Sequence, residues 1–274
     1  MGLFADFAAH APFLLMATPL FGAVLVWISS RRGLAAARQT ALVNATLTLG
    51  VAMLMAAKFS SDIPPRASSP AQMTSLIPWA EFPAGVRIVL ACGVDGVSLA
   101  PLLIVALLGW IVLVTADRCS PQWSAKSYAG LLVGQSLAMG GFAAQDFTAF
   151  LVGCELWAWW SFFLIGRHGG PERRTAAQSF LVTSSLAHAA WGLAGIGMAV
   201  CQAWIQTEVR RQATGISFLY PDMVWSLARS ITGNETALEI WTSFQPWVLA
   251  LWLIGLWLRW PLFPWHGWWP ALLS

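Results

Sequence analysis

The sequence predicts an all-α polytopic membrane protein with about seven transmembrane helices, on three observations. Of its 274 residues, 58% are hydrophobic and 10% are charged, whereas soluble domains carry roughly 25% charged residues. The mean hydropathy is +0.66. The 15 basic and 12 acidic residues stand in short clusters between long apolar runs. This composition excludes an ordinary soluble domain, and a net charge of +3 gives no indication of nucleic acid binding.

The expected spans are the apolar runs that are long enough to cross the hydrocarbon core of a bilayer, which takes about 20 residues. They must be helical because lipid offers no partners to backbone amides. We expect spans at 12–29, 40–57, 97–115, 128–144, 147–165, 177–204 and 246–260, within a single transmembrane domain that covers 1–274. The two longest connections are 58–96 and 205–245.

The ends of the spans carry characteristic residues. The N-terminus lacks the basic region of a cleaved signal peptide, so we expect the first span to be retained. Arginine, glycine and proline residues interrupt the apolar runs elsewhere. These are Arg31-Arg32-Gly33 after the first span, Pro64-Pro65 after the second, Gly169-Gly170-Pro171 after the fifth, and Pro261 and Pro264 after the seventh.

Charges between the spans predict the orientation, because Lys and Arg near span ends are retained on the cytoplasmic side. The loops after spans 1, 3 and 5 hold eight basic residues against two acidic ones, Asp117 and Glu172. The N-terminus and the loops after spans 2, 4 and 6 hold six basic residues against nine acidic ones. We therefore expect the N-terminus and the loops 58–96 and 205–245 outside, and the C-terminus inside.

Two charged residues remain within the spans, Glu155 in the fifth and Arg259 at the inner end of the seventh. An acidic side chain at the middle of a membrane helix costs about 2.5–3.5 kcal/mol, so such residues usually serve a function. Glu155 is a candidate proton relay, with a hydrogen-bonded structural Glu as the alternative. Arg259 either tunes that site by its charge or extends to the membrane surface, and it does not release its proton.

The sixth span holds the densest group of polar side chains, among them Gln178, Ser184 and His188. Hydroxyls and an imidazole can carry a hydrogen-bonded water chain, and His titrates in the useful pH range. Small polar residues also help helices to pack closely. Relay and packing therefore both remain open for His188.

Tryptophan is unusually frequent, with 18 residues against two Tyr. Most of them fall near span ends, where Trp suits the membrane interface. Trp157, Trp159 and Trp160 instead flank Glu155 inside the fifth span. There they would restrict water access or pack against neighbouring helices, and a cation–π cage for a substrate is the weaker alternative.

The sequence lacks the motifs of a cofactor site. Its four cysteines have no metal-binding spacing, and nucleotide-binding, zinc-protease and haem patterns are absent. We expect no nucleotide, flavin or metal bound by this chain, and no active site of its own.

Several motifs follow one another in a fixed order along the chain. They are Asp95-Gly96-Val97-Ser98 at the third span, Glu155 ahead of Ser161-Phe162-Phe163-Leu164-Ile165-Gly166, and Arg259 ahead of Pro264-Trp265-His266 and Trp268-Trp269-Pro270. In order and spacing they resemble the N-terminal half of the antiporter-like membrane subunits of respiratory complex I. The likeness is greatest to the large distal subunit, which is related to the Mrp antiporters.

The resemblance implies a membrane-arm subunit of an NADH-quinone oxidoreductase-like complex, in which quinone reduction in a neighbouring subunit drives protons across the membrane. Taken together with the polar group of the sixth span, it gives Glu155, Arg259, His188, Gln178 and Ser184 as the expected proton-relay residues. It also implies a fold of inverted five-helix repeats with broken helices. The partners would be other membrane subunits and lipid, in a bacterial cytoplasmic membrane or an equivalent energy-coupling membrane.

Three features depart from the family pattern. Arg259 stands where the family has a Lys, and Gln178 and Ser184 replace a Lys and an Arg, with no acidic residue following. The chain also ends after the seventh-span motif, so a separate chain would supply the later spans, unless this is a reduced copy. The alternatives are a non-pumping scaffold subunit, or a membrane subunit of a Mrp-type antiporter, a membrane hydrogenase or an inorganic-carbon uptake system.

Overall fold

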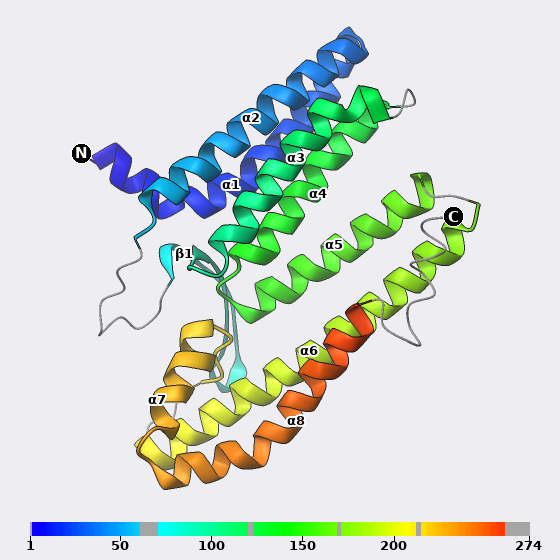
Figure 1. Cartoon of the computed structure of the whole chain (residues 1–274). Helices are drawn as coiled ribbons and strands as arrows, with labels where there is room; N and C mark the ends of the chain where they lie inside the picture. Colours follow the sequence, from blue (N-terminus) through cyan, green and yellow to red (C-terminus); the bar gives the residue numbers. More distant parts are fainter. Residues whose placement is uncertain (1, 61–70, 120–122, 169–170, 212–214, 261–274) are drawn as a thin grey trace. The chain divides into compact units, whose positions relative to one another are not determined.

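Seven long helices dominate the computed structural model, which describes residues 2–60, 71–119, 123–168, 171–211 and 215–260 (Figure 1). They are α1 (Gly2–Ser29), α2 (Leu34–Lys58), α3 (Leu99–Cys119), α4 (Ala125–Ala143), α5 (Phe147–His168), α6 (Arg173–Arg210) and α8 (Glu235–Arg259). The short elements are η1 (Ser30–Arg32), η2 (Pro83–Gly85), the π-helical turn η3 (Pro221–Ser226) and α7 (Leu227–Ile231). Each predicted span therefore has a helix.

Six of these helices are long and apolar enough to cross a membrane within the described ranges, namely all the long ones except α4. The 19 residues of α4 include Lys126, Gln135 and Ser136, which lower its hydropathy. Two helices extend beyond the predicted spans. α6 has 38 residues, and α8 begins at Glu235 with Pro246 inside it, because membrane helices tolerate proline.

A two-stranded sheet follows α2, in the predicted loop 58–96. Strands β1 (Gln72–Phe82) and β2 (Val86–Val94) pair with each other and are joined by η2. The prediction of an all-helical chain holds for the long helices and is incomplete for this loop. β1 includes Pro78, which cannot donate a backbone hydrogen bond to the ladder.

The chain divides into two compact units, each described by itself. The first unit comprises Met1–Leu76 and Ala91–Gln145, and the second unit comprises Ile77–Leu90 and Asp146–Ser274. The single transmembrane domain expected over 1–274 stays a prediction.

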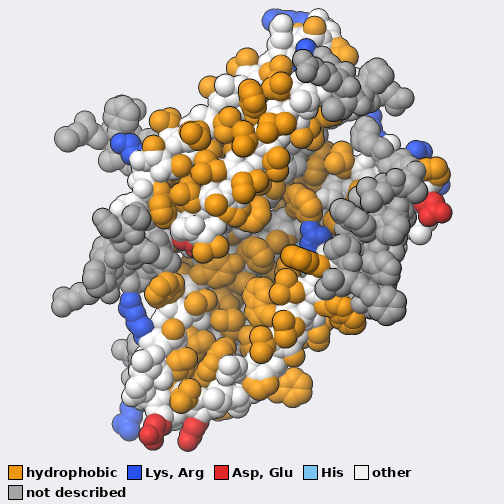
Figure 2. Space-filling view, viewed as in Figure 1, with side chains coloured by type: hydrophobic (Ala, Val, Ile, Leu, Met, Phe, Trp, Pro, Cys, Tyr) orange, Lys and Arg blue, Asp and Glu red, His pale blue; other side chains and the backbone are white. Residues whose placement is uncertain are grey.

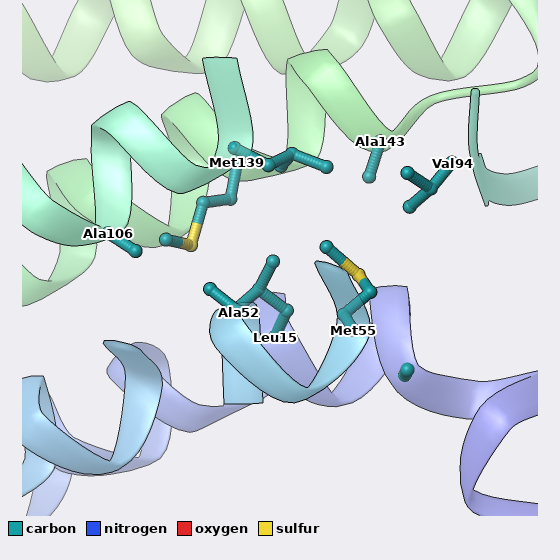
Figure 3. Close-up of a cluster of buried hydrophobic side chains, with 9 residues drawn as sticks. Leu15, Ala52, Met55, Val94, Ala106, Met139 and Ala143 are labelled. Atoms are coloured by element: carbon teal, nitrogen blue, oxygen red, sulfur yellow. The ribbon is translucent and has the colours of Figure 1, made fainter. Parts of the chain in front are cut away.

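Small residues form the core of the first unit, where α1 packs against α2 and α4, and α3 packs against α2 and α4. Ala52, Ala106 and Ala143 are fully buried beside Leu15 and Met139 (Figure 3). Small side chains at these contacts let the backbones of membrane helices approach closely. The core therefore combines small side chains, which let the helices approach, with large ones such as Leu15 and Met139 that fill the space between them.

The second unit is built on α6, which packs along α8 and α5. Phe147, Trp191, Ala199 and Met223 form one of its buried apolar clusters. Hydrophobic side chains also cover much of the visible surface (Figure 2), and Leu156 on α5 is an exposed example. An exposed apolar surface of this extent suits helices that face lipid or other membrane subunits.

Candidate functional site

Helix α5 carries Glu155, and a buried carboxyl fixes where this helix begins. Asp146 precedes the first helical residue, and its Oδ1 accepts a hydrogen bond from the Ala149 backbone N–H at 2.9 Å, as an N-cap residue does. Asp146 is fully buried. Burial raises the pKa of this carboxyl, against the opposing hydrogen bonds from Ala149 and Thr148. Glu155 lies nine residues further along α5, roughly 13 Å along the helix axis.

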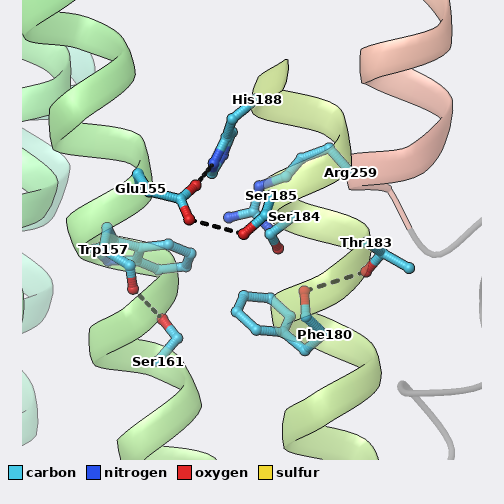
Figure 4. A network of polar contacts seen from close by, with 9 residues as sticks. All are labelled: Glu155, Trp157, Ser161, Phe180, Thr183, Ser184, Ser185, His188 and Arg259. Atoms are coloured by element: carbon cyan, nitrogen blue, oxygen red, sulfur yellow. Dashed lines mark hydrogen bonds and ion pairs between the residues drawn. The ribbon is translucent and has the colours of Figure 1, made fainter. Parts of the chain in front are cut away.

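The Glu155 carboxylate binds two side chains of α6 (Figure 4). Ser185 Oγ donates a hydrogen bond to Oε1 at 2.7 Å. His188 Nδ1 lies 2.6 Å from Oε2. Ser185 and His188 are three residues apart and therefore face α5 from adjacent turns of α6. The Glu155 carboxylate thus bridges two side chains on one face of α6.

Burial differs between the two titratable partners. The His188 side chain is 6% exposed, and the Glu155 side chain is 35% exposed. A proton held by this pair can sit on either the carboxylate or the imidazole, since both groups bind protons. The arrangement can therefore hold one proton either as an ion pair, with the proton on His188, or as a neutral pair, with the proton on Glu155.

Arg259 lies beside this pair and is held in a different way. Its guanidinium carbon is 5.1 Å from the centre of the Trp157 ring and 5.2 Å from that of Phe180, within the range of cation–π attraction. Its Nη1 donates a hydrogen bond to Ser184 Oγ at 3.3 Å. Among the described residues, Glu155 forms its ion pair with His188 and not with Arg259. Arg259 is therefore a fixed positive charge between α5 and α6.

The other residues expected on the relay are less closely involved. Ser184 is buried and meets only Arg259 among the predicted relay residues, while Gln178 is exposed on α6. Ser161 Oγ donates to the Trp157 carbonyl oxygen at 2.8 Å, a bond within α5. The structure thus brings Glu155 to His188, and Arg259 to Ser184.

The first family motif has a local structural role. The Ser98 backbone N–H donates to Asp95 Oδ1 at 2.7 Å, and the Asp95 N–H donates to Ser98 Oγ at 2.9 Å. These reciprocal bonds start α3 in the manner of a capping box. A Cβ added at Gly96 would meet no atom within 4 Å. Pro264, His266, Trp268 and Pro270 lie outside the described residues.

Sequence reasoning left out two members of this site. Ser185 is one of several polar residues in the sixth span. Only its spacing of three residues from His188 indicates that the two side chains lie on the same helix face. No sequence feature distinguishes Phe180 as a site residue, because an aromatic residue in an apolar helix resembles any core residue. No group of three His, Cys, Asp or Glu side chains that could hold a metal ion occurs in the described part of the chain.

Comparisons with known proteins agree on the fold. No family model matches the chain. It is 23% identical over 265 residues to F(420)H(2) dehydrogenase subunit M of Methanosarcina mazei, covering 95% of this chain and 48% of that protein. The chain therefore spans about half the length of this curated relative.

Solved structures give the same result at 18–20% identity. A chain of the Mrp complex from a Dietzia species matches with a TM-score of 0.68, over 96% of this chain and 25% of that one. A chain of respiratory complex I from Thermus thermophilus matches with 0.66, over 95% and 46%. The archaeal membrane-bound sulfane sulfur reductase matches with 0.60, over 95% and 36%. The chain thus has the fold of the antiporter-like membrane subunits of complex I, Mrp and related assemblies.

Proposed function

We propose that this chain is a membrane-arm subunit of a complex I-like assembly and contributes to proton translocation coupled to quinone reduction. The observation that carries the proposal is the contact of Glu155 with His188, a carboxylate and an imidazole 2.6 Å apart within two apolar helices. Both groups exchange protons, and intramembrane acids mark proton pathways. The matched relatives, which belong to complexes of this kind, support the same assignment.

The partner of Glu155 distinguishes this site from a static ion pair. A carboxylate bound to an arginine would keep its charge, because the guanidinium never deprotonates. Here the arginine instead contacts Trp157, Phe180 and Ser184. Glu155 therefore keeps a partner that can take up its proton, and the fixed charge of Arg259 biases the pair from one side.

The proposal extends to partners and location. Since the chain spans 48% of its curated relative, we propose that further membrane helices, from a second chain or from the rest of a longer one, complete the pathway. The assembly would reside in a bacterial cytoplasmic membrane or an equivalent energy-coupling membrane.

A non-pumping scaffold subunit is the second candidate. The position where the family has a titratable Lys holds Arg259, and this favours a structural role. A Mrp-type antiporter, a membrane hydrogenase or an inorganic-carbon uptake system would use the same fold.

The test compares two acid-to-amide variants in the purified assembly, reconstituted in vesicles. Glu155→Gln keeps the size and one hydrogen-bond acceptor but removes proton exchange. We expect turnover-driven proton uptake to fall by about tenfold or more, while the subunit composition is unchanged. Glu208→Gln, on the exposed surface of α6, is the matched control and should pump normally. Normal pumping by Glu155→Gln would overturn the relay role of Glu155 and favour the scaffold candidate.

A further inference from the structure

Beyond His188, α6 enters an aromatic cluster that interrupts its polar face. The His188 ring lies 5.7 Å from the Trp191 ring, and Trp191 lies 5.7 Å from Trp252. Phe147 contacts Trp252 at 6.1 Å and Tyr220 at 6.4 Å. We call Phe147, Phe150, Trp191, Tyr220 and Trp252 the aromatic barrier. Its rings form an unbroken series that starts at His188.

Polar groups lie on both sides of this barrier. On one side are Ser185 and the Arg259–Ser184 contact. On the other side, Gln202 and Gln206 donate to Ser226 Oγ at 2.9 Å and 3.2 Å. Fourteen residues of helix separate His188 from Gln202, roughly 21 Å, and place both within about 40° of one face. The barrier therefore divides one polar face of α6 into two parts.

The Gln202 end of this face has an unused hydrogen-bonding atom. Gln202 Oε1 is buried, since the residue is only 7% exposed, and this atom has no hydrogen-bond partner among the described residues. A buried polar atom of this kind is commonly satisfied by water. Along α6, Trp191 lies between His188 and this atom, and its ring is next to His188.

Helix α8 holds Trp191 in place. Trp191 Nε1 donates to the Trp252 carbonyl oxygen at 3.3 Å. A Cβ added at Gly255, one turn further along α8, would collide with the Trp191 indole. The absence of a side chain at Gly255 thus leaves the space that the Trp191 ring occupies, which we call the notch. Arg259 follows one turn later on the same helix. A shift of α8 would move both the notch and the fixed charge beside the relay pair.

The geometry points to Trp191 as a gate on the proton path beside His188. This inference rests on the proposed function of Glu155 and His188. Trp191 holds the imidazole against the carboxylate and closes the path toward Gln202 and Ser226. This end of α6 is the one expected on the outer side of the membrane. Apolar constrictions block ions and protons because water does not fill them. The relay pair is then closed toward Gln202 and Ser226 until α8 releases the indole, while Glu155 stays accessible on its exposed side.

The test measures passive proton leak in vesicles that contain the intact assembly without substrate, under an imposed potassium diffusion potential. Trp191→Ala should raise the leak about tenfold over the wild type, because the constriction next to His188 is lost. Trp204→Ala is the matched control, since Trp204 lies on the same helix, is exposed and makes an edge-to-face contact with Phe244, which is not part of the barrier. It should leave the leak unchanged.

A double variant identifies the route of the leak. Combining Trp191→Ala with Glu155→Gln should return the leak to the wild-type level, because the open path passes through Glu155. A leak that persists in the double variant, or no leak in assembled Trp191→Ala, overturns the gate. If Trp191→Ala does not assemble, the second variant is Trp191→Phe, which keeps a ring but loses the Nε1 hydrogen bond. Its proton leak should be severalfold higher than that of the wild type. A Trp191→Phe assembly with the wild-type leak overturns the gate equally. Turnover-driven pumping by Glu155→Gln alone tests the proposed function separately.

Discussion

In the first unit, buried amides and hydroxyls bind the backbone of a neighbouring helix, whereas in the second unit a half-buried acid and a buried imidazole bind each other. Asn44 Nδ2 donates to the Thr18 carbonyl oxygen at 2.9 Å, and Ser136 Oγ donates to that of Met16 at 2.6 Å. Gln135 Nε2 lies 3.4 Å from the carbonyl oxygen of Ala106. None of these side chains in the first unit titrates near neutral pH.

Glycines of the first unit make room for these amides. A Cβ added at Gly22 would overlap the Asn44 amide, and one at Gly109 would overlap the Gln135 amide. The polar groups are therefore part of the packing, fitted into notches as small membrane residues usually are. The second unit uses glycine in the same way at Gly255, but for an indole beside a titratable pair. Buried polarity in a membrane helix thus indicates function only when the bound group is itself a side chain that can exchange protons.

The largest expected effect comes from removing the imidazole while keeping a hydrogen-bond donor. His188→Gln should lower proton pumping by about tenfold or more, because the amide can bind Glu155 but cannot accept its proton. The matched variant in the first unit is Gln135→Leu, which loses a weak bond worth about 0.6 kcal/mol and should pump normally. Pumping by reconstituted vesicles, normalised to assembled protein, measures both. Equal losses in the two variants would erase the distinction between the units.

Packing in the first unit gives a second, smaller effect. Gly109→Ala would displace the Gln135 amide from the Ala106 carbonyl oxygen, and because this amide ends a flexible side chain the cost should be small, about 0.6 kcal/mol. The expected readout is a lower melting temperature of the solubilised assembly with unchanged pumping at low temperature. Gly50→Ala on α2 is the control, because a Cβ there meets no atom within 4 Å.

A compensating change tests the same contact. Gly109→Ala combined with Gln135→Ser should recover most of the lost stability, since the shorter side chain vacates the notch. If the double variant is as unstable as Gly109→Ala alone, the Gln135 amide is not what the glycine accommodates.

The sequence identified the residues of the site better than their contacts. Glu155 was recognisable because a charge in an apolar run is costly, and His188 because it lies in the most polar span. Their contact depends on how α5 faces α6, which side-chain packing decides and no local pattern encodes. Arg259 illustrates the limit most clearly. Its position next to the membrane surface favoured no single partner, and the rings that hold it come from residues 157 and 180, far away in the chain.

The aromatic barrier shows the same limit for the fold. Its rings come from α5, α6, α8 and the residue before η3, and each one alone is an ordinary apolar residue of a membrane helix. The seven helices were predictable because hydropathy is a local property. The barrier and the sheet in the loop 58–96 were not, because both depend on contacts between distant segments.

The smallest expected effect concerns Asp146, which belongs to the second unit but binds backbone as the first unit does. Because burial raises the pKa of this carboxyl above its ordinary value of 3.8, the folded protein favours the protonated form. The stability that this group contributes is complete below that ordinary value and is lost as the pH rises through the raised one.

Asp146→Asn should remove this pH dependence while it keeps the helix start, because an Asn oxygen caps the Ala149 N–H as an Asp oxygen does. The melting temperatures of variant and wild type should agree at acidic pH and separate as the pH rises, with the variant the more stable. Thermal unfolding of the solubilised assembly from about pH 4 to pH 8 covers this window. Parallel curves would mean that folding leaves the pKa of Asp146 unchanged, so that this carboxyl adds no more pH dependence than the uncharged amides of the first unit.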